Sequence, residues 1–166
     1  MRRRILGALV GAAVVACGGG TAPVADRVAE AKVAARFAGW VSAWNLRRAD
    51  LLAPFYLPNE RLTVTWPTGE HTQGWAQEAA LQQRFLPTVT VTNLVPQTPR
   101  VLLVRGNLAL ITFPFTLDLA AGGSRQIGSG QGIMLWQYEG GDWRIYAAQL
   151  SYTNAVQAQV VPQRRQ

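Results

Sequence analysis

The order of helix-like and strand-like segments predicts an α+β fold for this chain of 166 residues. Residues 24–46 carry apolar side chains at three- and four-residue spacing, which is the pattern of an amphipathic helix. Residues 88–151 consist mainly of short runs with alternating or β-branched side chains, separated by turns that contain Gly or Pro. Helices collected on one face of an antiparallel sheet define the α+β class.

The clearest single element is a hairpin near the end of the sequence. Residues 132–138 and 143–151 are both rich in β-branched and aromatic side chains, and residues 139–142 connect them with the sequence Glu-Gly-Gly-Asp. A short connection of this composition is a strong local signal for two antiparallel strands. We expect the other strands to pair with this hairpin or to pack on it.

The first half of the chain is expected to be mainly helical. After the long N-terminal helix, Asp50 is placed to cap a short helix over residues 50–55. Residues 61–66 alternate with the period of a half-buried strand. A further helix is expected over residues 75–86, because Pro87 cannot continue it.

The second half is expected to be a run of strands that ends before the C-terminus. Strand-like segments occupy residues 88–94 and 101–104, then residues 108–119, and the hairpin completes the sheet from Arg125 onward. Beyond residue 152 the periodicity is lost. We therefore expect one domain over residues 24–152 and a loose tail over residues 153–166.

The N-terminus has the features of a bacterial export signal. Three arginines precede an apolar stretch over residues 5–16, which is shorter than the roughly 20 residues that a membrane-spanning helix needs. The stretch ends in Val-Val-Ala followed by Cys17, which resembles a bacterial lipobox. Cys17 is the only cysteine of the chain, and the alternative role for it is a buried free thiol.

A lipobox at this position predicts how the protein is anchored. Residues 1–17 would be a lipoprotein signal peptide with Cys17 as the lipidated residue, and the Gly-rich residues 18–23 a flexible tether. More than one acyl chain makes such an anchor effectively permanent, so we expect an exported protein on the periplasmic side of the cell envelope. No acidic residue follows Cys17 directly, which favours the outer membrane.

The formal net charge of +7 does not predict a nucleic-acid partner. Five of the 16 basic residues lie at the two ends of the chain, and the other eleven nearly balance the nine acidic residues. A basic stripe that could follow a phosphate backbone is therefore not evident.

Several short motifs, in their order and spacing over residues 24–152, resemble the nuclear transport factor 2-like superfamily. They are Trp44, Asp50, Gly74, the turn at residues 105–109, and residues 142–145 followed by Ser151. The likeness is greatest to the SnoaL-like and ketosteroid-isomerase-like bacterial domains. It implies a cone in which a curved antiparallel sheet wraps the helices and leaves a pocket at its open end. It also implies a possible homodimer, because such sheets often pair face to face.

Members of that superfamily include isomerases, cyclases and dehydratases as well as binding modules, so the fold does not decide the function. An enzyme would need a general acid or base in the cone. His71 is expected in an exposed turn. Because it is the only histidine of the sequence, a multi-histidine metal site is excluded. Asp118 is a weak candidate base, which either faces the cavity or marks the end of a strand.

The last strand predicts a polar but non-ionisable pocket. If Trp143 points inward, strand alternation places Gln149 on the same face, with Gln131 on the neighbouring strand. Glutamine can orient a ligand but cannot exchange protons near neutral pH. The predicted pocket residues are Trp40, Tyr56, Trp66, Gln131, Trp136 and Gln149. The alternative for the four aromatic residues is that they fill the core.

These observations favour a lipid-anchored envelope protein that binds a small hydrophobic ligand or a protein partner without catalysis or a cofactor. One alternative is a SnoaL-like isomerase, cyclase or dehydratase that acts on a small apolar substrate. A second alternative is a dimeric scaffold.

Overall fold

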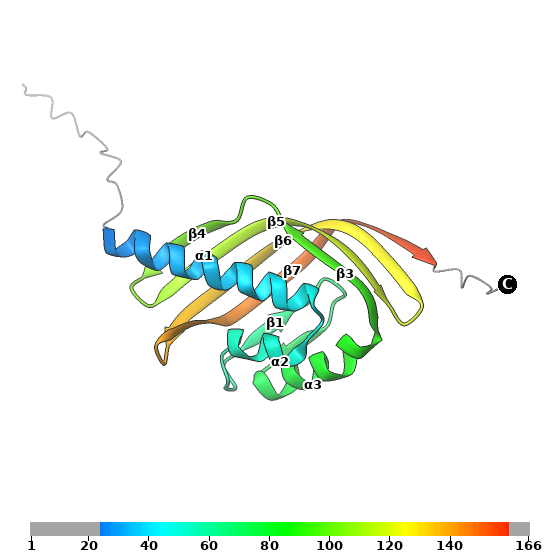
Figure 1. Ribbon diagram of the computed structural model, residues 1–166, viewed down its shortest axis with the longest axis horizontal. Helices are drawn as coiled ribbons and strands as arrows, with labels where there is room; N and C mark the ends of the chain where they lie inside the picture. The colour runs from blue at the N-terminus through cyan, green and yellow to red at the C-terminus, as the bar shows by residue number, and fades with distance from the viewer. Residues whose placement is uncertain (1–23, 160–166) are drawn as a thin grey trace, which may run out of the picture.

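A long helix lies along the inner face of a curved, open sheet in the computed structural model, which describes residues 24–159 (Figure 1). The helix is α1 (Val24–Asn45), and the sheet contains seven strands. The expected signal peptide, Cys17 and the tether over residues 18–23 lie outside the described residues. None of the helices within residues 24–159 has both the length and the hydropathy of a membrane span.

The remaining elements follow in the expected order, helices first and strands later. The other helical segments are α2 (Ala49–Leu52), the 3-10 turn η1 (Ala53–Phe55), α3 (Trp75–Phe85) and the 3-10 turn η2 (Leu86–Thr88). The strands are β1 (Thr63–Thr65), β2 (His71–Gln73), β3 (Val89–Pro96), β4 (Arg100–Arg105), β5 (Leu108–Ala121), β6 (Ser124–Glu139) and β7 (Asp142–Gln159).

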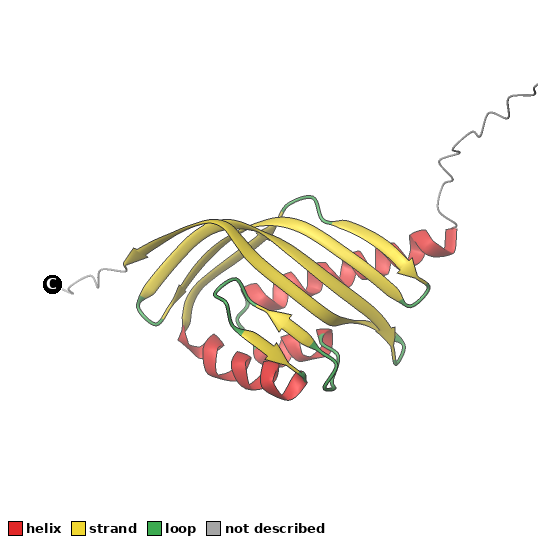
Figure 2. Ribbon diagram, turned by 180° about the vertical axis from the view of Figure 1, so that it is seen from behind, coloured by secondary structure: helices red, strands yellow, loops and turns green. Residues whose placement is uncertain are grey.

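The sheet has the order β2-β1-β7-β6-β5-β3, and β4 pairs with the same strand, β5, as β3 does. All pairs are antiparallel except β1 with β7, which run parallel. Figure 2 shows the long strands arching over the helices without closing into a barrel. The predicted α+β fold with a curved sheet around N-terminal helices is confirmed.

The apolar stripe of α1 forms the centre of the core. Val33, Phe37, Trp40 and Trp44 recur at spacings of four and three residues and are all buried. Phe37 packs on Phe113 of β5, with ring centroids 4.7 Å apart. The stripe therefore fixes α1 across the inner face of the sheet.

Arg36 ties α1 to the two segments beside it. Its Nη2 donates to the carbonyl oxygen of Pro54 at 2.7 Å and its Nε to that of Trp143 at 3.3 Å. The guanidinium also pairs with Asp142 at 3.2 Å and lies 4.3 Å from the ring centroid of Phe55. One side chain thus connects α1, η1 and the start of β7.

Glycines in β6 let aromatic rings of β5 lie against the strand. A Cβ atom on Gly132 would come within 2.3 Å of the Phe113 ring, and one on Gly130 within 2.5 Å of the Phe115 ring. Any larger residue would displace these rings from the core. The Gly-rich half of the strand is therefore a packing feature.

Two sequence predictions about chain segments are wrong. Asp50 does not cap the short helix: the N-cap is Arg48, and Asp50 sits in the first turn, where its Oδ1 accepts from Arg48 Nε at 2.8 Å. The loose tail does not begin at residue 153, because β7 continues to Gln159 and pairs with the first residues of β6. The missing signal was long-range pairing with β6, which local periodicity does not report.

Candidate ligand pocket

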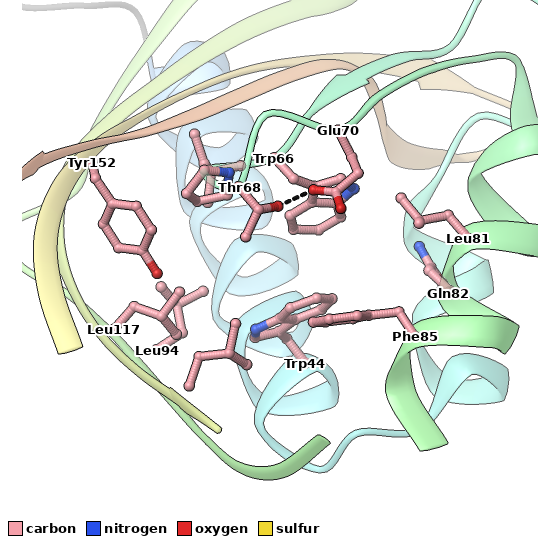
Figure 3. Close-up of a pocket in the computed structure, with 13 residues that line it drawn as sticks. Trp44, Trp66, Thr68, Glu70, Leu81, Gln82, Phe85, Leu94, Leu117 and Tyr152 are labelled. Atoms are coloured by element: carbon pink, nitrogen blue, oxygen red, sulfur yellow. Dashed lines mark hydrogen bonds between the residues drawn. The ribbon is translucent and has the colours of Figure 1, made fainter. Parts of the chain in front are cut away.

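A partly open pocket lies between α1, α3, the β1–β2 loop and the inner face of the sheet (Figure 3). Its volume is about 40 Å³. The lining residues are mostly aromatic or aliphatic, and are Trp44, Trp66, Pro67, Thr68, Glu70, Leu81, Gln82, Phe85, Leu94, Leu117, Leu119, Leu150 and Tyr152. A concave apolar site with a few polar groups is the usual form of a small-molecule site.

Aromatic rings lead from the core into one wall of this pocket. Phe37, Trp40, Trp44 and Trp66 form a series of nearly parallel rings, in which adjacent rings are inclined by 22°, 18° and 16°. The last pair is in close contact, with centroids 4.7 Å apart. We call this series the aromatic column, and its pocket end consists of Trp44 and Trp66.

Two polar atoms of pocket residues have no partner among the described residues. They are the hydroxyl of Tyr152 and the Oε1 of Gln82, and both are buried. Figure 3 shows the Tyr152 hydroxyl turned toward the interior of the site. Burial raises the pKa of Tyr152 to about 12, so near neutral pH this hydroxyl can donate a hydrogen bond.

A buried carboxylate lies behind the wall of the pocket. Glu78 of α3 is fully buried and accepts hydrogen bonds from Thr72 Oγ1 at 2.6 Å, Trp66 Nε1 at 3.3 Å and Gln82 Nε2 at 2.8 Å. An indole N–H can only donate, so Trp66 and Thr72 give hydrogen bonds to Oε2 while Gln82 gives one to Oε1. Within residues 24–159 no basic side chain forms an ion pair with Glu78. The three donors are what compensates its burial.

Of the predicted pocket residues, only Trp66 lines the pocket. Trp40, Tyr56 and Trp136 are fully buried core residues that do not reach it. Trp40 Nε1 donates to the Tyr56 hydroxyl at 2.9 Å. Burial, and then the charge of Glu78, raises the pKa of Tyr56 well above its usual value, so this phenol stays neutral within the core.

The prediction that Gln149 points inward is wrong, because β7 contains a bulge. Trp136 pairs with Ile145 and the preceding residue Leu135 with Ala147, which leaves Tyr146 as an extra residue. One extra residue reverses the alternation, so Gln149 is exposed and its neighbours Ala148 and Leu150 are buried.

Gln131 of β6 is exposed as well and pairs with Ser151 of β7. The two glutamines therefore lie on the outer face of the sheet. They do not form the polar wall that the alternation predicted.

Neither ionisable candidate from the sequence faces the pocket. Asp118 lies between the buried Leu117 and Leu119 on β5, so it faces the outer side of the sheet. It pairs there with Arg125 through contacts of 2.8 and 2.6 Å, and these hydrogen bonds lower the pKa of Asp118. His71 is exposed, as expected, but lies on β2 rather than in a turn.

Sequence reasoning missed the polar residues that the structure brings to the site, Glu78, Gln82 and Tyr152. Glu78 and Gln82 lie eight and four residues before the buried Leu86, hence on the same helix face, which was the available signal. Tyr152 was assigned to the end of the domain, and its inward direction depends on the bulge. Among the described residues, no group of three potential ligands could hold a metal ion.

No protein-family model matches this sequence, and no curated protein is significantly similar to it. Solved structures are similar in fold. A proposed scytalone dehydratase from Novosphingobium aromaticivorans is 14% identical, with a TM-score of 0.72 over 86% of this chain and 97% of that chain. The hexachlorocyclohexane dehydrochlorinase LinA-type3 from Novosphingobium barchaimii is 11% identical, with a TM-score of 0.69 over 84% and 98%.

A nuclear transport factor 2-like superfamily protein from Salmonella enterica is 18% identical, with a TM-score of 0.69 over 78% of this chain and 94% of that chain. At these identities the similarity concerns the fold. The chain therefore has the nuclear transport factor 2-like fold, an α+β cone.

Proposed function

We propose that this protein binds a small hydrophobic molecule in the pocket between α1, α3 and the sheet. The observation that carries the proposal is the composition of the pocket wall. Nine of its thirteen lining residues are Leu, Phe, Trp or Tyr, and the only carboxylate among them is Glu70 at the mouth. Transfer of an apolar ligand from water into contact with such a wall is favourable in free energy.

The first experiment measures binding of the neutral dye Nile red, whose fluorescence increases in apolar surroundings. We use the full chain with Cys17→Ser, which prevents lipid attachment. Leu94→Phe fills part of the pocket, since Leu94 is buried and lines it. Val95→Phe on the same strand is the matched control, because Val95 is exposed and does not line the pocket.

The dye should bind the parent chain and the Val95→Phe variant, and at least several-fold more weakly to Leu94→Phe. Equal binding by both variants would refute the pocket as the site. Native mass spectrometry of the purified protein then reports any retained molecule. The same spectrum gives the oligomeric state, which separates the binding protein from a dimeric scaffold.

An elimination enzyme is the second candidate. It is supported by the names of two proteins with this fold, a proposed dehydratase and a dehydrochlorinase. In this chain the carboxylates beside the pocket are Glu70 and Glu78, so one of them would serve as the base. Turnover of an apolar alcohol or halide that is lost in Glu70→Gln or Glu78→Gln would favour the enzyme.

We further propose that Cys17 carries a lipid that holds this domain at the periplasmic side of a membrane, the outer membrane by preference. The support is the lipobox-like sequence before Cys17. Metabolic labelling with a palmitate analogue tests it: the parent chain should take up label, and a labelled Cys17→Ser variant would refute the assignment.

A further inference from the structure

The electrostatic character of the pocket differs from that of the whole chain. The formal net charge is +7, yet none of the thirteen lining residues is Lys, Arg or His. Glu70 lies at the mouth, and the carboxylate of Glu78 is held behind Trp66 and Gln82. The carboxyl groups of Glu70 and Glu78 are thus placed at and behind a pocket wall without basic side chains, which disfavours an anionic ligand.

Aromatic side chains surround the cavity on several sides. They are Trp44 of α1, Trp66 of the loop after β1, Phe85 of α3 and Tyr152 of β7. Figure 3 shows them arranged around the same space. Several aromatic rings around one cavity can receive a methylated ammonium group through their faces, which carry negative charge density. The faces that Trp44 and Trp66 turn toward each other are already in contact, with centroids 4.7 Å apart, so a cation would meet the remaining faces. Trp66 also donates its indole N–H to Glu78 at 3.3 Å, and this hydrogen bond increases the negative charge density on the ring face.

The amide of Gln82 adds an acceptor to the site. Its Nε2 donates to Glu78 Oε1 at 2.8 Å, and a carboxylate cannot donate in return. With this amide orientation Oε1 is the buried atom without a hydrogen bond of good geometry, and the Tyr56 hydroxyl also interacts with the Gln82 side chain. Gln82 is 2% exposed and lines the pocket, so a ligand with a polarised C–H or N–H group would satisfy this oxygen.

The size of the cavity limits how much of a ligand can enter. A volume of about 40 Å³ accommodates a compact group, so most of a larger molecule, Nile red included, would lie at the open mouth of the pocket. The remainder of the ligand would lie at the mouth, near Thr68 and Glu70, which are both exposed.

From these observations we propose that the pocket receives the ammonium head group of an organic cation, with the charge facing the aromatic rings and Glu70 at the mouth. This inference rests on the proposed function and names the ligand class of the same site.

The experiment compares three probes of nearly equal shape in displacing Nile red from the full Cys17→Ser chain. Choline carries a trimethylammonium group, 3,3-dimethylbutan-1-ol is its neutral counterpart, and 3,3-dimethylbutanoate is an anionic one. Choline should displace the dye at a concentration at least about tenfold lower than either counterpart, since a cation gains from each ring it faces.

Two variants test the cause of that preference. Glu70→Gln should reduce the advantage of choline several-fold, whereas Glu60→Gln, an exposed carboxylate that does not line the pocket, should leave it unchanged. Phe85→Leu keeps the wall apolar but removes one ring, and should weaken choline more than the alcohol.

The outcomes separate the two proposals. If Nile red binds and the three probes displace it equally, or none displaces it, the cation inference is overturned and the hydrophobic site remains. If Nile red does not bind, or binds Leu94→Phe as well as the parent chain, the proposed function fails and the inference fails with it.

Discussion

Replacing Thr72 with valine should destabilise the protein by about 2 kcal/mol. Thr72 is 7% exposed, and its hydroxyl makes the shortest of the three hydrogen bonds to Glu78, at 2.6 Å. Valine keeps the shape of the side chain but removes the donor, so one oxygen of a buried carboxylate loses a charge-assisted hydrogen bond of roughly 1.5–3 kcal/mol. For a domain of this size the midpoint of thermal unfolding should fall by about 8 °C.

Urea unfolding followed by tryptophan fluorescence measures this change as a lower midpoint at constant slope. Thr65→Val is the matched control, because Thr65 on β1 is half-buried and bonds only the exposed His71, so its cost should stay below about 0.5 kcal/mol. A double-mutant cycle adds Glu78→Leu, in whose background Thr72→Val should cost almost nothing. An equal cost in both backgrounds, or a Thr72 effect no larger than the control, would refute the role of Glu78 as a buried hydrogen-bonded carboxylate.

Three other predictions concern the packing and ionisation of single side chains. Arg36→Met should lower the free energy of unfolding by about 2 kcal/mol, because the carbonyl groups of Pro54 and Trp143 lose their hydrogen-bond donor. Arg48→Met removes only an exposed ion pair with Asp50 and should cost less than about 0.5 kcal/mol in the same urea assay. Gly132→Ala should lower the free energy of unfolding by about 2 kcal/mol or more, because the new Cβ overlaps the Phe113 ring. Gly106→Ala, with no atom within 4 Å of the new Cβ, should be nearly neutral. Equal costs for the two variants would contradict the close approach of the Phe113 ring to Gly132. The pKa of Tyr152 in the folded protein is about 12, against about 10 in the unfolded chain, so between these pH values the folded state keeps a proton that the unfolded state has lost. The free energy of unfolding should therefore fall as the pH rises from about 10 toward 12. Tyr152→Phe should remove this part of the alkaline loss of stability, and an unchanged pH profile would contradict the burial of the Tyr152 hydroxyl.

The sequence predicted the fold well because its signals are local periodicities. The four-and-three spacing in residues 24–46 identified α1, and the Glu-Gly-Gly-Asp connection identified the β6–β7 hairpin. The pairing of β1 with β7 in parallel has no local signal, since it joins Thr63 to Ala147 across the whole domain. Long-range pairing of this kind decides where a sheet ends and what covers it.

The site was predicted less well because the burial of its polar residues depends on tertiary contacts, which local sequence patterns do not report. Glu78 and Gln82 are polar residues on a helix, and composition alone places such residues in solvent. They are buried because Thr72 and Trp66 supply the hydrogen bonds that burial requires. Likewise, strict alternation assigned Gln149 to the interior, and one unpaired residue was enough to reverse it.

The bulge at Tyr146 is a position where the chain can change its length without changing its interior. As the strand stands, Ala148, Leu150 and Tyr152 face inward, while Gln149 and Ser151 face solvent. Deleting the one extra residue would keep the pairs Trp136–Ile145 and Leu135–Ala147, so Ala148, Leu150 and Tyr152 would still face inward. The strand can therefore lose a residue at this position without any change in the side chains that it presents to the pocket.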